Sequence, residues 1–350
     1  MVTLIILILM LGILVFVHEF GHFIVAKKTG VHVEEFAIGM GPQILKWKRK
    51  NDPTVYSLRL FPIGGFCAMA GEVYEEEGKK LPKNKYMCNK KPIERFLILV
   101  AGVTMNFILA IIIFFIQGLI WGSTEQLSYI GTITENSQME KAGIEEGDRV
   151  ISINGLKTNT WDKIQIAVAL NNKKDSYDFV VKKEDGSIKK YEVTPDKQKI
   201  DGEETLVFGF GAKHELNRGI INSIKYAFIK FYSVMSSMAI IIVKLITGKL
   251  GLKSLAGPVG MYTVVGESAK LGIQNLLYLT AYLSVNLGFI NILPFPAFDG
   301  GRVLFLIIEK IKGSQVNPKL ENTIHTIGFI LLMLLMLVIT YQDILRLFQK

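Results

Sequence analysis

Residues 2–26 read VTLIILILMLGILVFVHEFGHFIVA, an apolar run that carries three ionisable side chains near its C-terminal end. A helix needs about 20 residues to cross the hydrocarbon core of a bilayer. Ionisable side chains inside such a run are costly and usually mark a functional site. No basic residue precedes the run and no small-residue cleavage site follows it, which argues against a signal peptide. We therefore predict a transmembrane helix, within residues 1–26, that carries a functional group.

Half of the 350 residues are hydrophobic, and three further apolar stretches reach spanning length within residues 93–121, 273–301 and 324–345. Residues 213–272 contain another apolar run, from 220 to 246, which three lysines interrupt. We predict that this run lies on the membrane surface, with a fifth span as the alternative. The pattern predicts a polytopic α-helical membrane protein with about four transmembrane helices.

Residues 122–212 differ from the rest of the chain, because they are polar and contain short alternating runs typical of strands. Asn154-Gly155 is a turn signal between two such runs. We expect a small, mostly β, soluble domain inserted between the second and third spans.

The distribution of lysine and arginine orients the chain. Basic residues are absent before the first span, whereas Lys27 and Lys28 follow it directly, and the loops within residues 27–92 and 302–323 are also basic. The positive-inside rule places both loops in the cytoplasm and the inserted domain outside. The net charge of +9 comes largely from loops beside apolar runs and not from one continuous tract, so we expect no nucleic-acid partner.

The ionisable residues of the first span read His18-Glu19-Phe20-Gly21-His22. Two histidines four residues apart lie on one helix face and can share a single Zn²⁺. Glu19, between them, can accept a proton from metal-activated water. The pattern predicts a zinc site with Glu19 as general base. A pair of structural histidines is the alternative, which the apolar surroundings disfavour.

A catalytic zinc site has three protein ligands and an open position for water. Asp299 is the candidate for the third ligand, although spacing alone does not exclude His32. Counted from the outer end of its apolar stretch, at roughly 1.5 Å per residue, Asp299 reaches a depth similar to that of the histidine pair.

The residues before Asp299 support this choice. Pro294 and Pro296 break the helix, and non-helical backbone at membrane depth is tolerated only where it is buried in protein or lines a wet cavity. A hydrolase needs such a place for water and for an exposed substrate backbone. The alternative is that Asp299-Gly300-Gly301 is only a turn.

Together, the histidine motif and the segment Asn291–Gly301 resemble the site-2 protease family, in particular bacterial metalloproteases of regulated intramembrane proteolysis. The likeness covers nearly the whole chain. Further matching blocks are Pro62–Phe66 with Met69, Gly71 and Glu72, then Ala101-Gly102 with Asn106-Phe107, then Met139–Gly155, and Gly257–Gly260. The first block resembles the family's membrane-associated β-hairpin, here within residues 27–92, and the second resembles its second-span motif. Met139–Gly155 resembles its PDZ domain, and Gly257–Gly260 resembles a block before its third span.

The resemblance implies that His18, His22 and Asp299 bind zinc and that Glu19 activates water. It also implies a set of substrate-binding residues, namely Asn291, Gly64, Gly65, Pro294 and Asn106. The sequence departs from the family pattern at Ala68, Val103 and Phe298, which affects the expected substrate preference more than the chemistry.

The expected function is that of a zinc metalloendopeptidase of the cytoplasmic (inner) membrane. It would hydrolyse peptide bonds in single-span membrane proteins, such as anti-sigma factors or remnant signal peptides, close to the cytoplasmic side. The PDZ-like domain outside either captures C-termini or excludes bulky substrates. The oligomeric state stays open. The alternatives are an intramembrane metal transporter, which needs no general base, and a catalytically silent scaffold.

Overall fold

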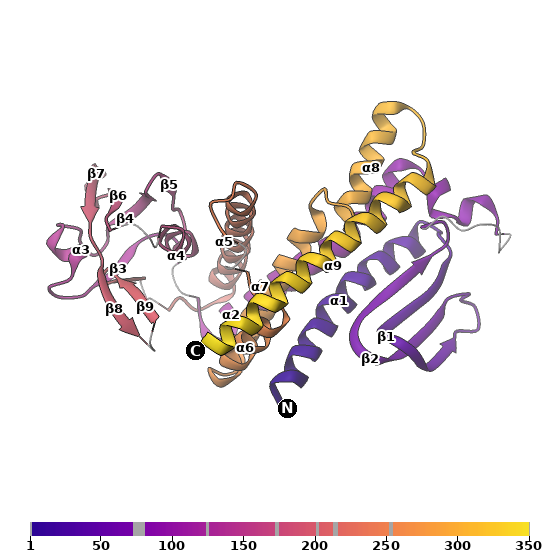
Figure 1. Ribbon diagram of the computed structural model, residues 1–350, viewed down its shortest axis with the longest axis horizontal. Coiled ribbons are helices and arrows are strands. Elements are labelled where there is room, and N and C mark those ends of the chain that lie inside the picture. The colour runs from indigo at the N-terminus through magenta and orange to yellow at the C-terminus, as the bar shows by residue number, and fades with distance from the viewer. Residues whose placement is uncertain are drawn as a thin grey trace. The chain divides into compact units, whose positions relative to one another are not determined.

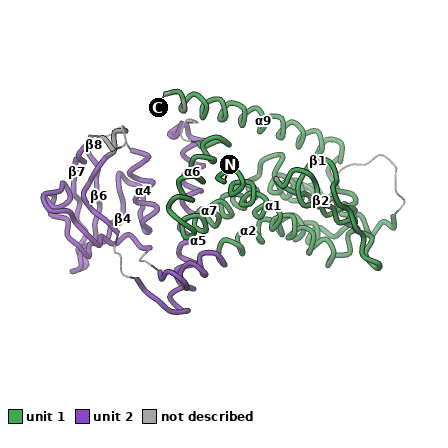
Figure 2. Tube along the Cα trace, turned by 90° about the horizontal axis from the view of Figure 1, so that it is seen from below, with its two compact units in different colours: residues 1–110, 252–350 green, residues 111–251 purple. Residues whose placement is uncertain are grey.

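The computed structural model describes residues 2–72, 81–123, 126–171, 175–200, 203–212, 216–251 and 255–349. The chain forms two compact units, one of residues 1–110 with 252–350 and the other of residues 111–251 (Figure 2). Each unit is built around its own set of contacts.

The first unit is mostly helical. Its elements are α1 (Val2–Lys28), β1 (Val33–Lys48), β2 (Val55–Met69), the short 3₁₀ turns η1 (Lys83–Lys85) and η2 (Met87–Asn89), most of α2 (Pro92–Trp121), α6 (Pro258–Lys270), α7 (Ile273–Ile292), α8 (Asp299–Lys312) and α9 (Pro318–Gln349) (Figure 1). Asp299, predicted at the end of the third apolar stretch, is the first residue of the separate helix α8.

Five helices in the described part of the chain, α1, α2, α5 (Ile220–Ile246), α7 and α9, are long and apolar enough to cross a membrane. The sequence predicted four spans and a surface position for residues 220–246. On length and composition alone, α5 is a fifth candidate.

Side-chain contacts fix the relative directions of the helices in the first unit. His22 of α1 contacts Ile98 of α2, whereas His18, one turn earlier, contacts Asn106, so α1 and α2 are antiparallel. One buried cluster joins the first half of α1 to α6 and to the first half of α7; it contains Leu7, Met10, Leu14, Val265, Leu279 and Leu283. Since the later parts of α1 and α7 lead to His18 and Asp299, which are in contact, α1 and α7 run in the same direction.

The last helix, α9, runs opposite to α7. Near its start, Gly328 lies against Pro296, which follows α7. Near its end, Asp343 accepts the backbone N–H groups of Gly257 and Gly260, at 2.8 Å each. Asp343 therefore caps the first turn of α6, where free N–H groups favour an acidic partner.

Strands β1 and β2 form a sheet with four segments, because both strands bend. Ala37 lies opposite both Ser57 and Phe66, so the segment around Ala37 is the middle one of three. The segment 55–58 pairs on its other side with residues 45–48, where Leu45 lies opposite Leu58. The order of segments is therefore 45–48, 55–58, 33–38 and 65–69, and the last of them forms one edge of the sheet.

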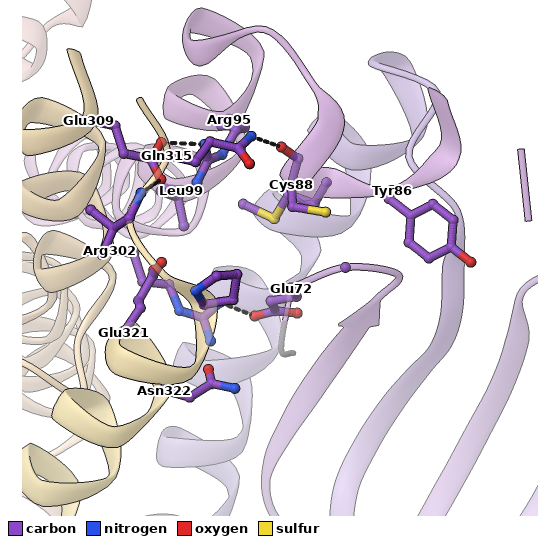
Figure 3. A pocket seen from close by; sticks show the side chains of 14 residues that line it. Glu72, Tyr86, Cys88, Arg95, Leu99, Arg302, Glu309, Gln315, Glu321 and Asn322 are labelled. Atoms are coloured by element: carbon purple, nitrogen blue, oxygen red, sulfur yellow. Dashed lines mark hydrogen bonds and ion pairs between the residues drawn. The ribbon is translucent and has the colours of Figure 1, made fainter. Parts of the chain in front are cut away.

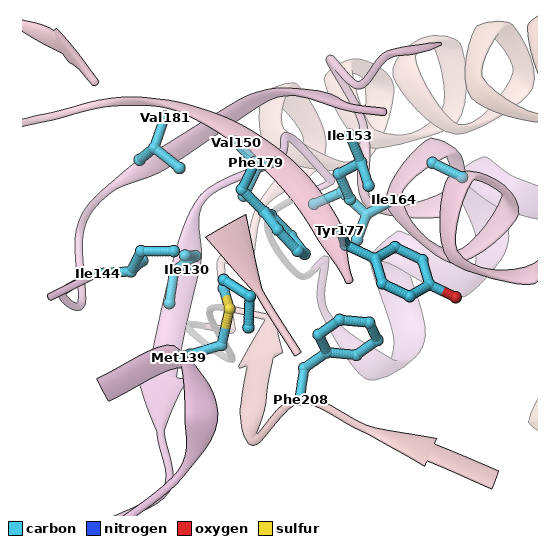
Figure 4. Close-up of a cluster of buried hydrophobic side chains, with 12 residues drawn as sticks. Ile130, Met139, Ile144, Val150, Ile153, Ile164, Tyr177, Phe179, Val181 and Phe208 are labelled. Atoms are coloured by element: carbon cyan, nitrogen blue, oxygen red, sulfur yellow. The ribbon is translucent and has the colours of Figure 1, made fainter. Parts of the chain in front are cut away.

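The second unit contains a soluble-type core in addition to α5 and the end of α2. Its elements are β3 (Ile130–Ile133), α3 (Gln138–Lys141), β4 (Arg149–Ile153), β5 (Leu156–Lys157), α4 (Trp161–Ala169), β6 (Tyr177–Lys182), β7 (Ile188–Val193), β8 (Asp196–Ile200), β9 (Glu203–Val207) and β10 (Phe210–Ala212). The strand orders in its sheets are β5-β4-β6-β7, β10-β3 and β8-β9. Figure 4 shows the buried core, in which Tyr177 and Phe179 of β6 face Phe208.

A buried ion pair holds the loop before β4. Lys183, whose side chain is 9% exposed, donates to Asp148 at 2.9 Å and to Glu145 at 3.0 Å, and the Asp148 side chain is 2% exposed. Burial alone would lower the pKa of Lys183, but the hydrogen bonds to the two carboxylates raise it above its ordinary value. The lysine is therefore charged at neutral pH.

We expect Lys183→Met to destabilise this unit by about 3 kcal/mol, because removing one partner leaves the buried Asp148 carboxylate without a counter-charge. Hydrogen exchange of β4 and β6 in the full chain measures the effect. Lys190→Met, at an exposed position of β7, is the matched control. Equal protection in the two variants would contradict the prediction.

Candidate metal centre

Three side chains in the first unit converge on one point. His18 Nε2 lies 3.0 Å from Asp299 Oδ2, His22 Nε2 lies 3.3 Å from the same oxygen, and the two Nε2 atoms are 3.1 Å apart. Two ligand atoms that are each about 2.1 Å from a tetrahedral Zn²⁺ are separated by about 3.4 Å. Two imidazoles and one carboxylate form a donor set typical of catalytic zinc, so these residues fit the ion.

Among the described residues, this is the one group of three or more histidine, cysteine or acidic side chains with ligand atoms this close. His32, which spacing had left open as a third ligand, is not part of it. Cys67 lies on the neighbouring sheet edge, but burial raises the pKa of its thiol. The thiol is therefore protonated at neutral pH and is a poor metal ligand.

Both histidines are oriented by α2. The carbonyl oxygen of Ile98 accepts a hydrogen bond from His22 Nδ1 at 2.8 Å. The side-chain nitrogen Nδ2 of Asn106, a fully buried residue, lies 3.2 Å from His18 Nδ1, while Asn106 Oδ1 has no hydrogen-bond partner among the described residues. A flip of the amide exchanges the two atoms and places Oδ1 where it accepts the Nδ1 proton. A histidine that coordinates zinc through Nε2 carries its proton on Nδ1, and a carbonyl or amide oxygen is the usual partner of that proton. These contacts direct both Nε2 atoms toward Asp299.

Asn106 was predicted to bind substrate. The contact seen here is with His18, which points to a role in orienting the ligand, and the substrate contact stays a prediction.

Gly102 of α2 is a part of the site that the sequence analysis did not assign a role. A Cβ atom at this position would lie 2.7 Å from His18 Nε2 and closer still to His22 Nε2. Only glycine lets α2 approach both imidazole rings. A small residue within a spanning helix signals a close approach, but the sequence does not say which partner approaches it.

Glu19 contacts the sheet edge. Its Oε2 atom accepts the backbone N–H of Cys67 at 3.0 Å. Because Cys67 belongs to the edge segment 65–69, Glu19 joins α1 to the edge of the sheet one residue after His18, which is a member of the metal group (His18, His22 and Asp299). The candidate general base is therefore next to backbone that could pair with an added strand.

The glycines after Asp299 let the chain turn from α7 into α8. A Cβ atom on Gly301 would lie 2.5 Å from the carbonyl oxygen of Phe295, and Gly300 is pressed against the end of α7 in the same way. The turn places Asp299 at the start of α8, opposite the histidines. Asp299, Gly300 and Gly301 therefore form the start of α8 and are not only a turn that ends a helix, and Asp299 belongs to the group of candidate ligands.

The backbone before Asp299 is held by α9. Ala297 has φ of 91°, a region that non-glycine residues rarely adopt, and its N–H donates to His325 Nδ1 at 3.1 Å. One turn later on α9, Gly328 packs so closely that a Cβ atom would lie 2.7 Å from the carbonyl carbon of Pro296. The structure therefore places His325 as a support for the loop that carries Asp299.

We expect His325→Ala to weaken zinc binding about tenfold, a typical effect of losing an outer partner of a metal ligand. His325→Asn, which keeps a side-chain acceptor, should retain most of the affinity. Competition with a chromophoric chelator measures affinity, and the visible absorption of the Co²⁺-substituted protein reports the ligand geometry. Thr326→Ala, at an exposed neighbouring position, is the control. Wild-type spectra in His325→Ala would contradict the positioning role.

A charged cavity of about 310 Å³ begins one helical turn from Asp299 (Figure 3). Arg302 of α8 forms an ion pair with Glu72, which follows β2, and Arg95 of α2 binds Glu309 of α8 at 2.6 Å. These pairs join α8 to the sheet and to α2. They therefore hold the helix that begins with the third candidate ligand.

The other predicted substrate-binding residues lie outside the three-residue metal group. Gly64 and Gly65 are in β2, where a Cβ atom on Gly65 would lie 2.7 Å from the carbonyl oxygen of Ala37. Asn291 is in the last turn of α7, and Pro294 is in the connection to α8. Their contacts with substrate stay predictions.

Comparison with known proteins gives a consistent family assignment. The sequence model described as peptidase family M50 matches residues 6–335. The chain is 36% identical to the zinc metalloprotease RasP of Bacillus licheniformis and 35% identical to the regulator of sigma-W protease RasP of Bacillus subtilis, over 99% of each chain. It is also 36% identical to a putative zinc metalloprotease of Clostridium acetobutylicum, over 98% of this chain and 97% of that relative.

Proposed function

The chain belongs to peptidase family M50 and is a zinc metalloprotease of the site-2 type, and from this premise we propose that it hydrolyses peptide bonds inside the membrane. The observation that carries the proposal is the position of the metal group. His18 and His22 lie within α1, an apolar helix of spanning length, and Asp299 is the residue that meets them. A bond cut at this site must be brought to the depth of these side chains.

In the proposed mechanism, His18, His22 and Asp299 hold Zn²⁺, which when bound polarises a carbonyl group and acidifies water. Glu19 accepts a proton from the attacking water and delivers it to the leaving nitrogen. The contacts of Asn106 and of the Ile98 carbonyl keep both imidazoles oriented during the reaction.

The substrate must be extended, because a helix keeps its carbonyl groups in intrahelical hydrogen bonds. The edge segment 65–69 can accept an added strand, and its Cys67 is already bonded to Glu19. Strand addition there would bring a scissile carbonyl to the base. Gly64 and Gly65 at the start of this edge, with Asn291 and Pro294 near the metal loop, are the proposed substrate contacts.

Helix directions support a topology with four spans. Because α1 and α2 are antiparallel and α7 is parallel to α1, residues 122–272 begin and end on the same side of the membrane. In the described part of this segment, α5 is the one helix of spanning length. If α5 crossed the membrane once, α7 would begin on the opposite side of the membrane and would run antiparallel to α1. This parity favours a surface position for α5, as the lysines in its sequence suggested.

The contacts of α5 within the second unit point the same way. Lys230 donates to Asp162 at 2.7 Å, and Ser233 donates to Asp162 at 2.7 Å. The hydroxyl oxygen of Ser233 also lies 2.8 Å from that of Thr160, from which it can accept a hydrogen bond. These polar bonds join the middle of α5 to the first turn of α4 in the inserted domain. The opposite face of α5 exposes large apolar side chains, including Ile224 and Phe228. A helix that lies on a bilayer surface has one polar face and one apolar face in the same way.

The proposed substrates are single-span proteins of the cytoplasmic membrane, with the inserted PDZ-like domain outside and the metal group near the cytoplasmic side. One relative is named a regulator of sigma-W protease, which favours anti-sigma factors as a substrate class. The domain of residues 122–212 would act as a size filter or as a binding module for C-termini.

Metal removal tests the proposal. Purified full-length protein in detergent should cut a single-span peptide within its apolar segment, as located by mass spectrometry. Chelation should abolish cleavage and added Zn²⁺ should restore it. Continued cleavage by zinc-free protein, or cleavage only outside the apolar segment, would show that the proposal is wrong.

A further inference from the structure

A second cavity of the first unit is a groove of about 870 Å³ between the first turns of α2 and the outer side of α8. Its floor is apolar, and it is formed by Ile93, Phe96, Val303, Leu306 and Ile307. The Arg95–Glu309 ion pair lines both this groove and the charged cavity beside it. The groove and the charged cavity are therefore neighbours with this ion pair as a shared wall.

The rim of the groove is cationic. Lys90, Lys91 and Lys310 line it, and Glu309 is the single acidic residue among the lining side chains. Glu309 is engaged by Arg95 at 2.6 Å, so it does not neutralise the lysines. Lys90 donates to the carbonyl oxygen of Thr29 at 2.6 Å. Within the described residues, the ammonium groups of Lys91 and Lys310 have no carboxylate partner within ion-pair distance, which leaves two cations available to an anion.

The walls of the groove continue into apolar surface. Ile93 of α2 is 60% exposed, and Ile307 and Ile311 of α8 are 51% and 83% exposed. Such a surface fits acyl chains better than water, and lysines at its edge are the usual arrangement where a helix meets lipid headgroups.

We propose that this groove binds one anionic phospholipid, with its phosphate between Lys91 and Lys310 and an acyl chain along Ile93, Phe96 and Ile307. Charge complementarity and the apolar floor favour a lipid over a free anion, which would leave the floor in water. The proposal rests on the orientation given above, in which the start of α2 lies at the cytoplasmic surface, where anionic lipids attract basic residues.

Lipid in this groove would act on the metal group through α8. That helix begins with Asp299 and forms one wall of the groove, while α2, which forms the other, orients both histidines. An occupant in contact with both helices would limit their relative motion. We therefore expect proteolysis to be faster in membranes that contain anionic lipid.

Native mass spectrometry of the full chain tests the proposal, with phosphatidylglycerol and phosphatidylcholine as the two probes. Wild-type protein should retain one phosphatidylglycerol more tightly than phosphatidylcholine. Lys91→Gln with Lys310→Gln should weaken that binding at least fivefold. The matched control, Lys157→Gln with Lys190→Gln, removes the same charge from exposed positions of the inserted domain and should change nothing.

Three results would overturn the proposal: equal retention of the two lipids by the wild type, unchanged retention by the groove variant, or displacement of the lipid by inorganic phosphate alone. Displacement by an acidic peptide that matches a substrate's cytoplasmic segment would instead assign the groove to substrate. Binding is also measured in Glu19→Gln protein, so that its outcome does not depend on proteolysis.

Discussion

Replacing Glu19 by Gln is expected to slow peptide cleavage by about 10²–10⁴-fold, the usual contribution of a general base, while leaving the zinc content unchanged. Glutamine keeps an oxygen that can accept the Cys67 N–H, so the contact with the sheet edge should survive. It cannot take a proton from water at neutral pH. The zinc ligands proposed here are other residues, so the metal should stay.

The measurement is cleavage of a single-span peptide, with zinc determined on the same samples. Glu135→Gln, at an exposed position of the inserted domain, carries the same chemical change away from the site and should cut like the wild type. If Glu19→Gln retained full activity, Glu19 would not be the base. If both proteins moved zinc across vesicles and neither cut peptides, the metal-transporter alternative would be favoured.

Replacing Gly102 by Ala is expected to lower zinc affinity by about 10–100-fold, the range found when a residue that positions a metal ligand is lost. The added Cβ atom would lie 2.7 Å from His18 Nε2, so the imidazole rings must move. His22 is tied to Ile98 and His18 to Asn106, so neither ring can move without losing its partner. The pair would no longer direct its Nε2 atoms at Asp299.

Zinc affinity, measured by chelator competition, separates this effect from general damage to α2. Thr104→Ala changes an exposed side chain two residues later on the same helix and should bind zinc normally. The thermal stability of the zinc-free proteins should be similar in both variants. Normal zinc binding by Gly102→Ala would mean that the histidines tolerate a wider separation from α2 than the structure indicates.

Local sequence signals were sufficient where chemistry depends on residues close together in the chain. His18 and His22 share a helix face because they are four residues apart, and Pro294 and Pro296 mark the end of a helix because proline lacks an N–H donor. Depth and the proline-broken helix pointed to Asp299 as the third ligand, the family resemblance implied the same role, and the structure places Asp299 3.0 Å from His18. The depth argument from spacing was compatible with Asp299, but it could not give a contact across 281 residues.

The sequence left the position of residues 220–246 open, and the reason is physical. Length and mean hydropathy do not distinguish a spanning helix from a long helix at the surface, because both expose an apolar face to lipid. The directions of α1, α2 and α7, together with the bonds from Lys230 and Ser233 to Asp162, favour the surface position. Helix directions and these hydrogen bonds depend on contacts between segments far apart in the chain, so the sequence alone does not reveal them.

By itself, the sequence determined the membrane class of the protein and predicted a metal motif with a candidate base and an inserted soluble segment, since each depends on composition or on spacing within one element. Only the tertiary structure decided that Gly102 admits both imidazoles, that Glu19 meets the sheet edge at Cys67, and that His325 supports the loop before Asp299. These contacts join residues 28 to 84 positions apart, and side-chain packing sets them, which no local pattern encodes.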